Sequence, residues 1–207
     1  MMWHFIDVDF IDRVLIHLFY CPMPSGRTHD SITLWGLPVV TGTTWFYTGN
    51  PTVAIVVAGS YLFSGLMFGP DLDIYSHQYQ RWGWFRWLWL PYRKMLRHRS
   101  VFSHGFLVGT IGRILYVAMI GGTAAGFGIL GWSIASHYQG VMSWDRAAFS
   151  LITGLIAPLW KNLQTHWILW LAVWFGLEAG AMSHSISDTI GSASKRSQRK
   201  RRSNRDR

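Results

Sequence analysis

Four long apolar segments place the strongest limit on how this chain can fold. They cover residues 31–49, 52–69, 105–132 and 167–187, and each is near the roughly 20 residues with which a helix crosses the apolar core of a bilayer. Because that core offers no water to the backbone, a spanning segment must be helical. A fifth apolar stretch, 148–160, is shorter, and its length favours a re-entrant or interfacial helix. We therefore predict an all-α polytopic membrane protein with about four transmembrane helices and one short re-entrant or interfacial helix.

The segments differ in character. A Thr-Gly-Asn-Pro turn separates the first two, which predicts a helical hairpin, and the third is rich in Gly and Ala, a composition suited to close helix packing. Residues 70–100 have a Trp-rich middle, RWGWFRWLWLPYRK. Aromatic residues interleaved with Arg and Lys are typical of a segment lying among lipid headgroups. The same interleaving suits single-stranded nucleic acid, but the apolar character of the chain favours the bilayer.

Charge is scarce and unevenly distributed. Of the 207 residues, 50% are hydrophobic and 14% are charged, whereas a soluble domain typically carries about 25% charged residues. Residues 195–207 hold eight of the 19 basic residues and so account for most of the net charge of +9. We predict that residues 193–207 form a disordered basic tail on the cytoplasmic side, in contact with anionic lipid headgroups. A specific nucleic-acid partner is not expected, because no recognition fold accompanies the charge.

The N-terminal residues 1–22 do not resemble a secretory signal. Asp7, Asp9 and Asp12 interrupt their apolar run, and no small-residue cleavage site follows. Met23 begins MPSGRTHD, which would make a natural protein start, so we predict that residues 1–22 are an extension from a mis-assigned start and that 23–192 form the helical domain. Cys21 is the only cysteine, which excludes an intrachain disulfide and a thiolate-based zinc site.

Four polar clusters flank the apolar segments. They supply His and Asp, which are costly at membrane depth and are usually there for function. The clusters are Thr28-His29-Asp30, Asp71-Leu72-Asp73 with His77, His98-Arg99-Ser100 with Ser103-His104, and Ser183-His184 with Asp188.

Each cluster alone has a structural explanation. Asp favours turns and helix starts, a lone His can pack between helices, and the basic pair His98-Arg99 can face lipid. His184 and Asp188, however, are four residues apart and share one face of a helix. Four crossings would also bring all the clusters to the cytoplasmic face together with the basic tail. If 148–160 crossed as a fifth helix, His184 and the tail would lie on the opposite face, so the metal hypothesis and the four-crossing topology depend on each other.

We predict a divalent-metal site at these clusters, with zinc as the first candidate and manganese or iron as alternatives, because imidazole and carboxylate suit all three. Asp73 or Asp30 would orient a water molecule, and Arg99 would hold an anionic group through its planar fork. Ser100 and Ser103 are candidate hydrogen-bond donors. The predicted metal ligands are His29, Asp71, His98, His104, His184 and Asp188.

Four other ionisable residues are left outside the predicted site. Arg113 and Glu178 lie within apolar segments and are expected to face each other or another polar partner inside the bundle. His137 and His166 fall in expected loops, and His137 should lie on the far face.

The order of the motifs MPSGRTHD, GLMFGPDLD, HRSVFSHG and GLEAGAMSHSISD resembles a family of bacterial and cyanobacterial metal-binding membrane proteins of unknown function. It is also similar to inner-membrane proteins regarded as metal-dependent hydrolases, and more distantly to soluble zinc-dependent phospholipases C and single-strand nucleases. The resemblance implies an integral protein of a bacterial inner, plasma or thylakoid-type membrane, with the six predicted ligands on the metal-holding motifs. The Ser-His-Gly ending of HRSVFSHG departs from the Thr-His-Ser common in the hydrolases.

The leading hypothesis is therefore a membrane-embedded, metal-dependent hydrolase of phosphoesters or lipids with its site on the cytoplasmic face. Its hydrolytic activity rests on analogy. The alternatives are a metal-binding or transport-associated membrane protein without hydrolysis, and a structural membrane scaffold.

Overall fold

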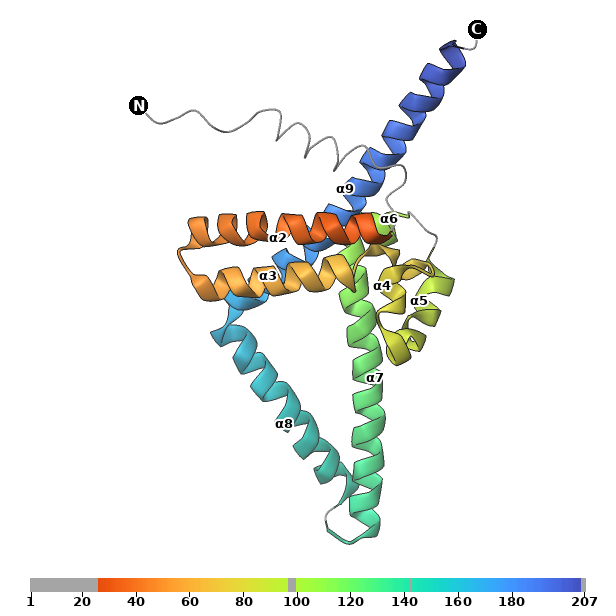
Figure 1. Ribbon diagram of the computed structural model, residues 1–207. Helices are drawn as coiled ribbons and strands as arrows, with labels where there is room; N and C mark the ends of the chain where they lie inside the picture. Colours follow the sequence, from red (N-terminus) through yellow and green to blue (C-terminus); the bar gives the residue numbers. More distant parts are fainter. Residues whose placement is uncertain (1–25, 97–99, 142, 206–207) are drawn as a thin grey trace.

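The computed structural model describes residues 26–96, 100–141 and 143–205 (Figure 1). Within these ranges the regular structure is all helical, which confirms the predicted fold class at that level. The described residues form five long helices, and short helical segments lie between the second and the third of them. The long helices are α2 (Gly26–Thr48), α3 (Pro51–Leu66), α7 (Val108–Tyr138), α8 (Trp144–Thr165) and α9 (Trp167–Arg205). The short segments are η1 (Pro70–Asp73), α4 (His77–Gln80), η2 (Gly83–Trp89), α5 (Leu90–Met95) and α6 (Val101–His104).

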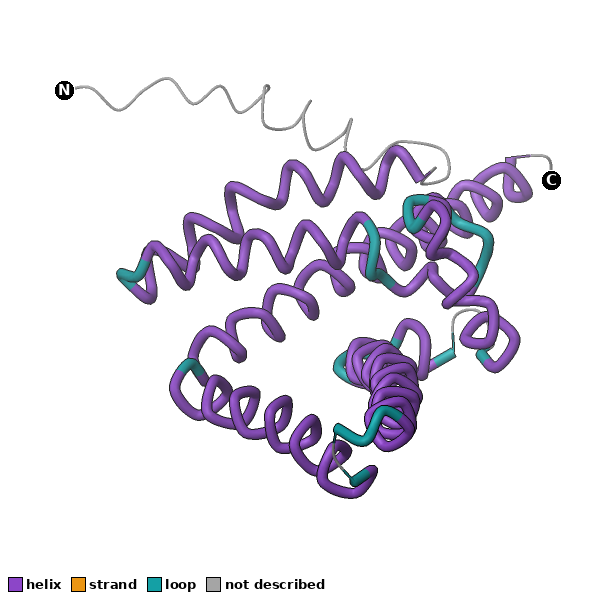
Figure 2. Tube along the Cα trace, turned by 90° about the horizontal axis from the view of Figure 1, so that it is seen from below, coloured by secondary structure: helices purple, strands orange, loops and turns teal. Residues whose placement is uncertain are grey.

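Helices α2 and α3 form the predicted hairpin and lie side by side (Figures 1 and 2). Gly49 supplies the positive φ of the turn. Asn50 caps α3 by accepting hydrogen bonds from the backbone N–H groups of Thr52 (2.9 Å) and Val53 (3.3 Å). Pro51 follows at the first helical position, where its missing N–H costs nothing. Turn chemistry alone thus explains why the chain reverses here.

Helix α9 packs most extensively against α3, and two glycines make this packing possible. A Cβ atom on Gly176 would lie 2.5 Å from the carbonyl oxygen of Val57, and one on Gly180 would lie 2.5 Å from that of Tyr61. Only glycine fits such a close approach. Because these glycines are four residues apart, they mark one face of α9, and the same face continues to His184.

The predicted close packing of the Gly-rich segment 105–132 is not found over most of its length. A Cβ atom on Gly121, Gly122, Gly126 or Gly128 would meet nothing within 4 Å. Glycine content alone does not tell which helix has a partner. The glycines in close contact with another helix are Gly176 and Gly180 on α9, which precede His184 and Asp188 on the same helix.

The aromatic segment divides into a buried and an exposed part. Trp89 and Tyr92 are buried and pack against Phe68 and Tyr116, so this half of the predicted headgroup segment belongs to the protein core. The exposed part faces outward from η2; its members are Trp84, Phe85 and Trp87.

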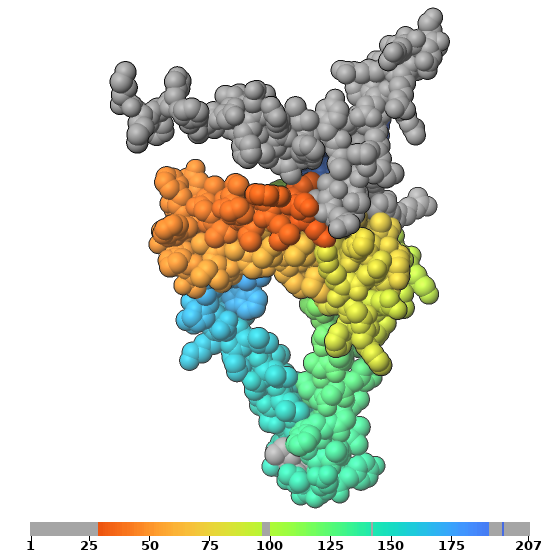
Figure 3. All heavy atoms as spheres, viewed as in Figure 1, coloured from red at the N-terminus to blue at the C-terminus, as the bar shows by residue number. Residues whose placement is uncertain are grey.

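Helices α7 and α8 extend away from the α2–α3 hairpin and meet at their far ends (Figures 1 and 2). The space-filling view shows an opening between them (Figure 3). Large apolar side chains cover both helices and are exposed; they include Phe127, Trp132, Phe149, Leu159 and Trp160.

The prediction of four crossings is not confirmed. By length and composition, two segments of the described residues are long and apolar enough to span a membrane, Pro51–Asp73 and α7. The first is also a core helix of this fold, so burial in protein explains its apolar character equally well. Helix α2 carries five threonines whose hydroxyls bond to carbonyls in the preceding turn, and α9 carries Glu178 and His184, which lowers the apolar character of both.

Two further expectations differ from the structure. The stretch 148–160 was expected to form a short helix, but it is the middle of the 22-residue α8, which begins at Trp144 and includes Pro158. The tail 193–207 was expected to be disordered, but α9 continues to Arg205. No proline interrupts that stretch, and Lys, Arg and Gln are good helix formers.

Candidate metal centre

Five of the six predicted metal ligands converge on one place in the fold. They come from four separate segments. His29 lies in the first turns of α2, Asp71 in η1, His104 at the end of α6, and His184 and Asp188 one turn apart on α9. The sixth predicted ligand, His98, and the predicted anion-binding Arg99 lie outside the described residues. We call the five residues the His–Asp cluster.

The two carboxylates occupy the middle of the cluster. Asp188 Oδ1 lies 3.1 Å from His29 Nε2, and its Oδ2 lies 4.0 Å from His104 Nε2. Asp71 Oδ2 lies 3.1 Å from His184 Nε2, and its Oδ1 lies 3.6 Å from His104 Nε2. The rings of His29 and His184 stack with their centroids 3.9 Å apart. Each of these two imidazoles therefore lies beside a carboxylate and against the other ring.

Several buried polar atoms of the cluster have no hydrogen-bond partner in the structure. They are Nδ1 of His29, Nε2 of His184 and Oδ1 of Asp71. His29 and His184 are only 6% and 3% exposed. Leaving such an atom unpaired costs about 1–3 kcal/mol, and a bound cation would remove that cost at nitrogen and carboxylate oxygen together. The donor set therefore fits a divalent metal ion.

Ser103 fixes the orientation of His104. Its hydroxyl donates a hydrogen bond to Oδ2 of Asp73, and its oxygen lies 2.7 Å from Nδ1 of His104. Because the single hydroxyl proton points at Asp73, the serine oxygen can only accept a hydrogen bond from Nδ1–H of His104. In the neutral imidazole the other ring nitrogen, Nε2, then carries the lone pair, and it faces the carboxylates of Asp71 and Asp188. Two carboxylates and an imidazole lone pair repel one another unless a cation lies between them.

Arg113 supports this arrangement from behind. Its side chain, 1% exposed, donates to the carbonyl of Ser103 and to the hydroxyl of Thr110, both at 3.0 Å. Glu178 accepts a hydrogen bond from the backbone N–H of Leu107 at 2.9 Å. Leu107 has a φ of +63°, a conformation that L-residues rarely adopt, and Glu178 helps to hold it. The expectation that Arg113 and Glu178 find polar partners inside the bundle is confirmed, although their hydrogen bonds go to other groups.

The remaining predicted residues lie at or beyond the edge of the cluster. Asp73 is 5% exposed and bonds to Ser103 rather than joining the five ligands. Asp30 was predicted as a helix cap or water-orienting group. Helix α2 begins four residues earlier, and the Asp30 carboxylate pairs with the Arg81 guanidinium, which raises the pKa of that guanidinium. His77 is exposed and is not among the five residues of the cluster.

The electrostatics of Asp188 reflect its place in the cluster. Burial raises the pKa of its carboxyl group, but the hydrogen bond with His29 and the charges of His184 and His29 outweigh that effect, so its pKa lies below the usual value. The carboxylate form, which binds metals, is therefore favoured.

One residue beside the His–Asp cluster was not anticipated from the sequence. Gln78, on α4, is buried with its Nε2 3.5 Å from Nδ1 of His184, and it donates a hydrogen bond to the carbonyl of Gly65 at 2.8 Å. No spacing of Gln78 from the His and Asp residues in the sequence indicates that it lies beside them. Its proximity to Gly69, where a Cβ atom would collide with the Gln78 amide, is a tertiary contact that no local pattern indicates.

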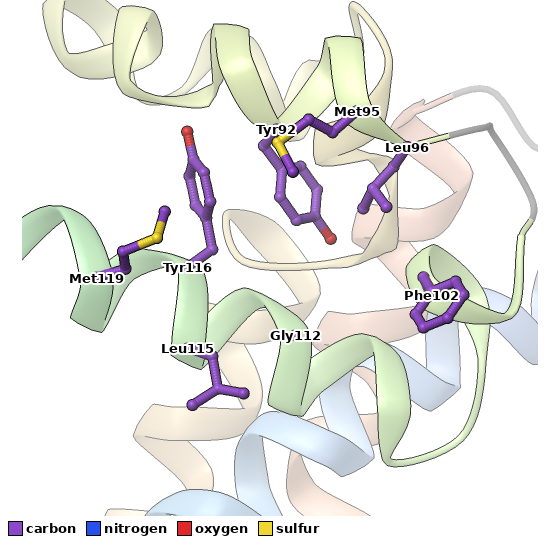
Figure 4. A pocket seen from close by; sticks show the side chains of 8 residues that line it. All are labelled: Tyr92, Met95, Leu96, Phe102, Gly112, Leu115, Tyr116 and Met119. Carbon is purple, nitrogen blue, oxygen red and sulfur yellow. The ribbon is translucent and has the colours of Figure 1, made fainter.

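An apolar cavity of about 250 Å³ lies between α5 and α7 (Figure 4). Tyr92, Leu96 and Tyr116 line it, and Phe102 stands at its edge. Since Phe102 precedes Ser103 and His104 in α6, that short helix contributes both to the cavity and to the His–Asp cluster.

Known proteins resemble parts of this chain or most of it. An uncharacterized protein from Aquifex aeolicus (strain VF5) is 34% identical over 58 residues, which are 28% of this chain and 40% of that protein. The chain thus spans about two fifths of the length of this curated relative. No solved structure is significantly similar to the chain. Residues 24–198 match the family described as uncharacterized metal-binding protein (DUF2227), and the chain therefore belongs to that family.

Proposed function

We propose that the protein is a membrane-embedded hydrolase that uses a divalent metal, with zinc as the first candidate, held by the His–Asp cluster, and that its substrates are phosphoesters or lipids. The observation that carries the proposal is the meeting of three imidazoles and two carboxylates from four distant segments, with Nε2 of His104 directed at both carboxylates. Three histidines and two aspartates are a donor set that zinc, manganese and iron accept.

The residues of such a site would have different roles. A bound divalent ion supplies a water of lowered pKa and polarises the bond that is cleaved. His29 and His184 are enclosed, whereas the side chains of Asp71, His104 and Asp188 are 12–17% exposed and leave a side open to substrate. Asp73 and Ser103 orient the His104 ring through Nδ1, so that its Nε2 is the nitrogen directed at Asp71 and Asp188.

Membrane embedding is supported by the exposed apolar surface of α7 and α8. A monomeric soluble protein rarely exposes a contiguous apolar patch larger than a few hundred Å², and both helices carry large apolar side chains along their length. We place the basic C-terminal segment and the His–Asp cluster on the cytoplasmic side, with the basic residues against anionic lipid headgroups.

The test uses full-length protein purified in detergent micelles. We expect it to retain zinc through purification and to hydrolyse a generic phosphodiester or a phospholipid, with loss of activity after chelation and recovery on adding zinc. Asp188→Asn should abolish both binding and activity, whereas His166→Ala, at the junction of α8 and α9, should change neither. Metal binding without hydrolysis of either substrate class would instead support a non-catalytic metal-binding protein, and absence of metal would overturn the proposal.

A further inference from the structure

The His–Asp cluster is divided between its two carboxylates in a way that a single ion does not explain. Each aspartate directs one oxygen at the pair His29 and His184 and the other oxygen at His104. For Asp188 the oxygens are Oδ1 towards His29 and Oδ2 towards His104. For Asp71 they are Oδ2 towards His184 and Oδ1 towards His104.

The ligand atoms also form two groups rather than one. His29, His184 and Asp188 make the first, and Asp71, His104 and Asp188 make the second, with atoms in each group within 4.8 Å of one another. Two ligands of one zinc ion are at most about 4.4 Å apart, since zinc bonds to nitrogen and oxygen are about 2.0–2.2 Å long. Asp188 belongs to both groups, which is the position of a bridging carboxylate.

We infer that the cluster binds two divalent cations, bridged by Asp188 and Asp71. His29 and His184 hold the enclosed ion, and His104 holds the ion on the partly exposed side. Both imidazoles are buried, and the ligand atoms of His29, His184 and Asp188 lie within 4.8 Å of one another, which supports the enclosed position. An enclosed ion suits a structural role, whereas a position with open coordination suits substrate binding. This inference rests on the proposed function only in requiring that the cluster bind metal.

The experiment measures metal stoichiometry in the full-length protein. After chelation, the protein is titrated with zinc, freed of excess, and analysed for zinc per chain by mass spectrometry of the elements. We expect two ions per chain for the natural sequence and for His166→Ala. His29→Ala and His104→Ala should each retain one ion, while Asp188→Asn should lose both at the zinc concentration that saturates the natural sequence.

The outcomes separate this inference from the proposed function. One ion per chain in the natural protein would overturn the two-ion inference and leave metal binding intact, whereas no ion would overturn the metal site itself. If His29→Ala does not fold, as judged by circular dichroism, the manganese-loaded natural protein provides the decision. Two bridged Mn²⁺ ions give an exchange-coupled paramagnetic resonance spectrum, and the spectrum of isolated Mn²⁺ would contradict the inference.

Discussion

At the scale of single residues, the cluster depends on which nitrogen of His104 carries its proton. Asp73 and Ser103 together place a proton on Nδ1, so that in the neutral imidazole the lone pair lies on Nε2, which faces Asp71 and Asp188. Neither Asp73 nor Ser103 needs to touch a metal to matter, because a group that orients a ligand commonly changes metal affinity 10–100-fold, as an order of magnitude.

Ser103→Ala should therefore weaken zinc binding by about 10–100-fold without unfolding the protein. The reason is that His104 loses the acceptor for its Nδ1 proton, and the ring is free to take the other tautomer. Competition with a chromophoric chelator measures the affinity. Ser133→Ala is the matched control, since Ser133 is equally buried but bonds only to the carbonyl of Ile129 in its own helix. Equal affinities in the two variants would contradict the role of Ser103.

Arg113→Met should lower the free energy of unfolding by about 3 kcal/mol. The substitution leaves the carbonyl of Ser103 and the hydroxyl of Thr110 without their donor in a buried place. Chemical denaturation in detergent micelles measures the loss. A change below about 0.5 kcal/mol, the size expected for an exposed substitution, would show that Arg113 does not support α6 as described.

At the scale of elements, α9 positions two of the five ligands, His184 and Asp188. One face of α9 carries, at four-residue spacing, Gly176, Gly180, His184 and Asp188. The packing of α9 against α3 therefore also determines where His184 and Asp188 lie along the helix axis. The sequence indicates the face through the spacing of His184 and Asp188. It does not indicate that glycines on the same face, rather than those of segment 105–132, are the ones in contact.

Gly180→Ala should cost about 1–3 kcal/mol of stability, as overpacking does, and should weaken zinc binding as well. The added methyl group meets the backbone of α3 at Tyr61 and Gly65, which cannot move aside as a side chain would. Thermal unfolding and zinc titration measure the two effects. Gly121→Ala is the control, because a methyl group there meets open space. Similar behaviour of the two variants would mean that α9 and α3 are not in close contact.

At the scale of the whole molecule, the sequence predicts the helical class, the hairpin and the set of residues that converge. Metal-ligand residue types in a fixed order are visible in the chain, and their convergence follows from helices that return to one end. Other contacts join side chains of distant segments, and no local pattern in the sequence indicates them. They are the hydrogen bonds of Ser103, Gln78 and Arg113 and the ion pair of Asp30 with Arg81. The sequence likewise does not determine the number of membrane crossings, because a long apolar segment can be buried in a protein core or can span a bilayer.

Topology can be tested with single cysteines in a Cys21→Ser background. If the helices cross as proposed, a cysteine at Gln139, between α7 and α8, should react with a membrane-impermeant maleimide in intact cells. A cysteine at Ser203, in the basic segment, should react only after the membrane is permeabilised. Labelling of both positions from outside, or recovery of the protein in the soluble fraction, would contradict the proposed membrane embedding.

The central claim is that His29, Asp71, His104, His184 and Asp188 hold metal together. The most direct measurement is an anomalous-difference map from a crystal of the zinc-loaded protein, recorded on both sides of the zinc absorption edge. The account predicts that the strongest anomalous density lies among these five side chains and disappears in Asp188→Asn. Zinc bound only at other residues, or a cluster without anomalous density at saturating zinc, would contradict it.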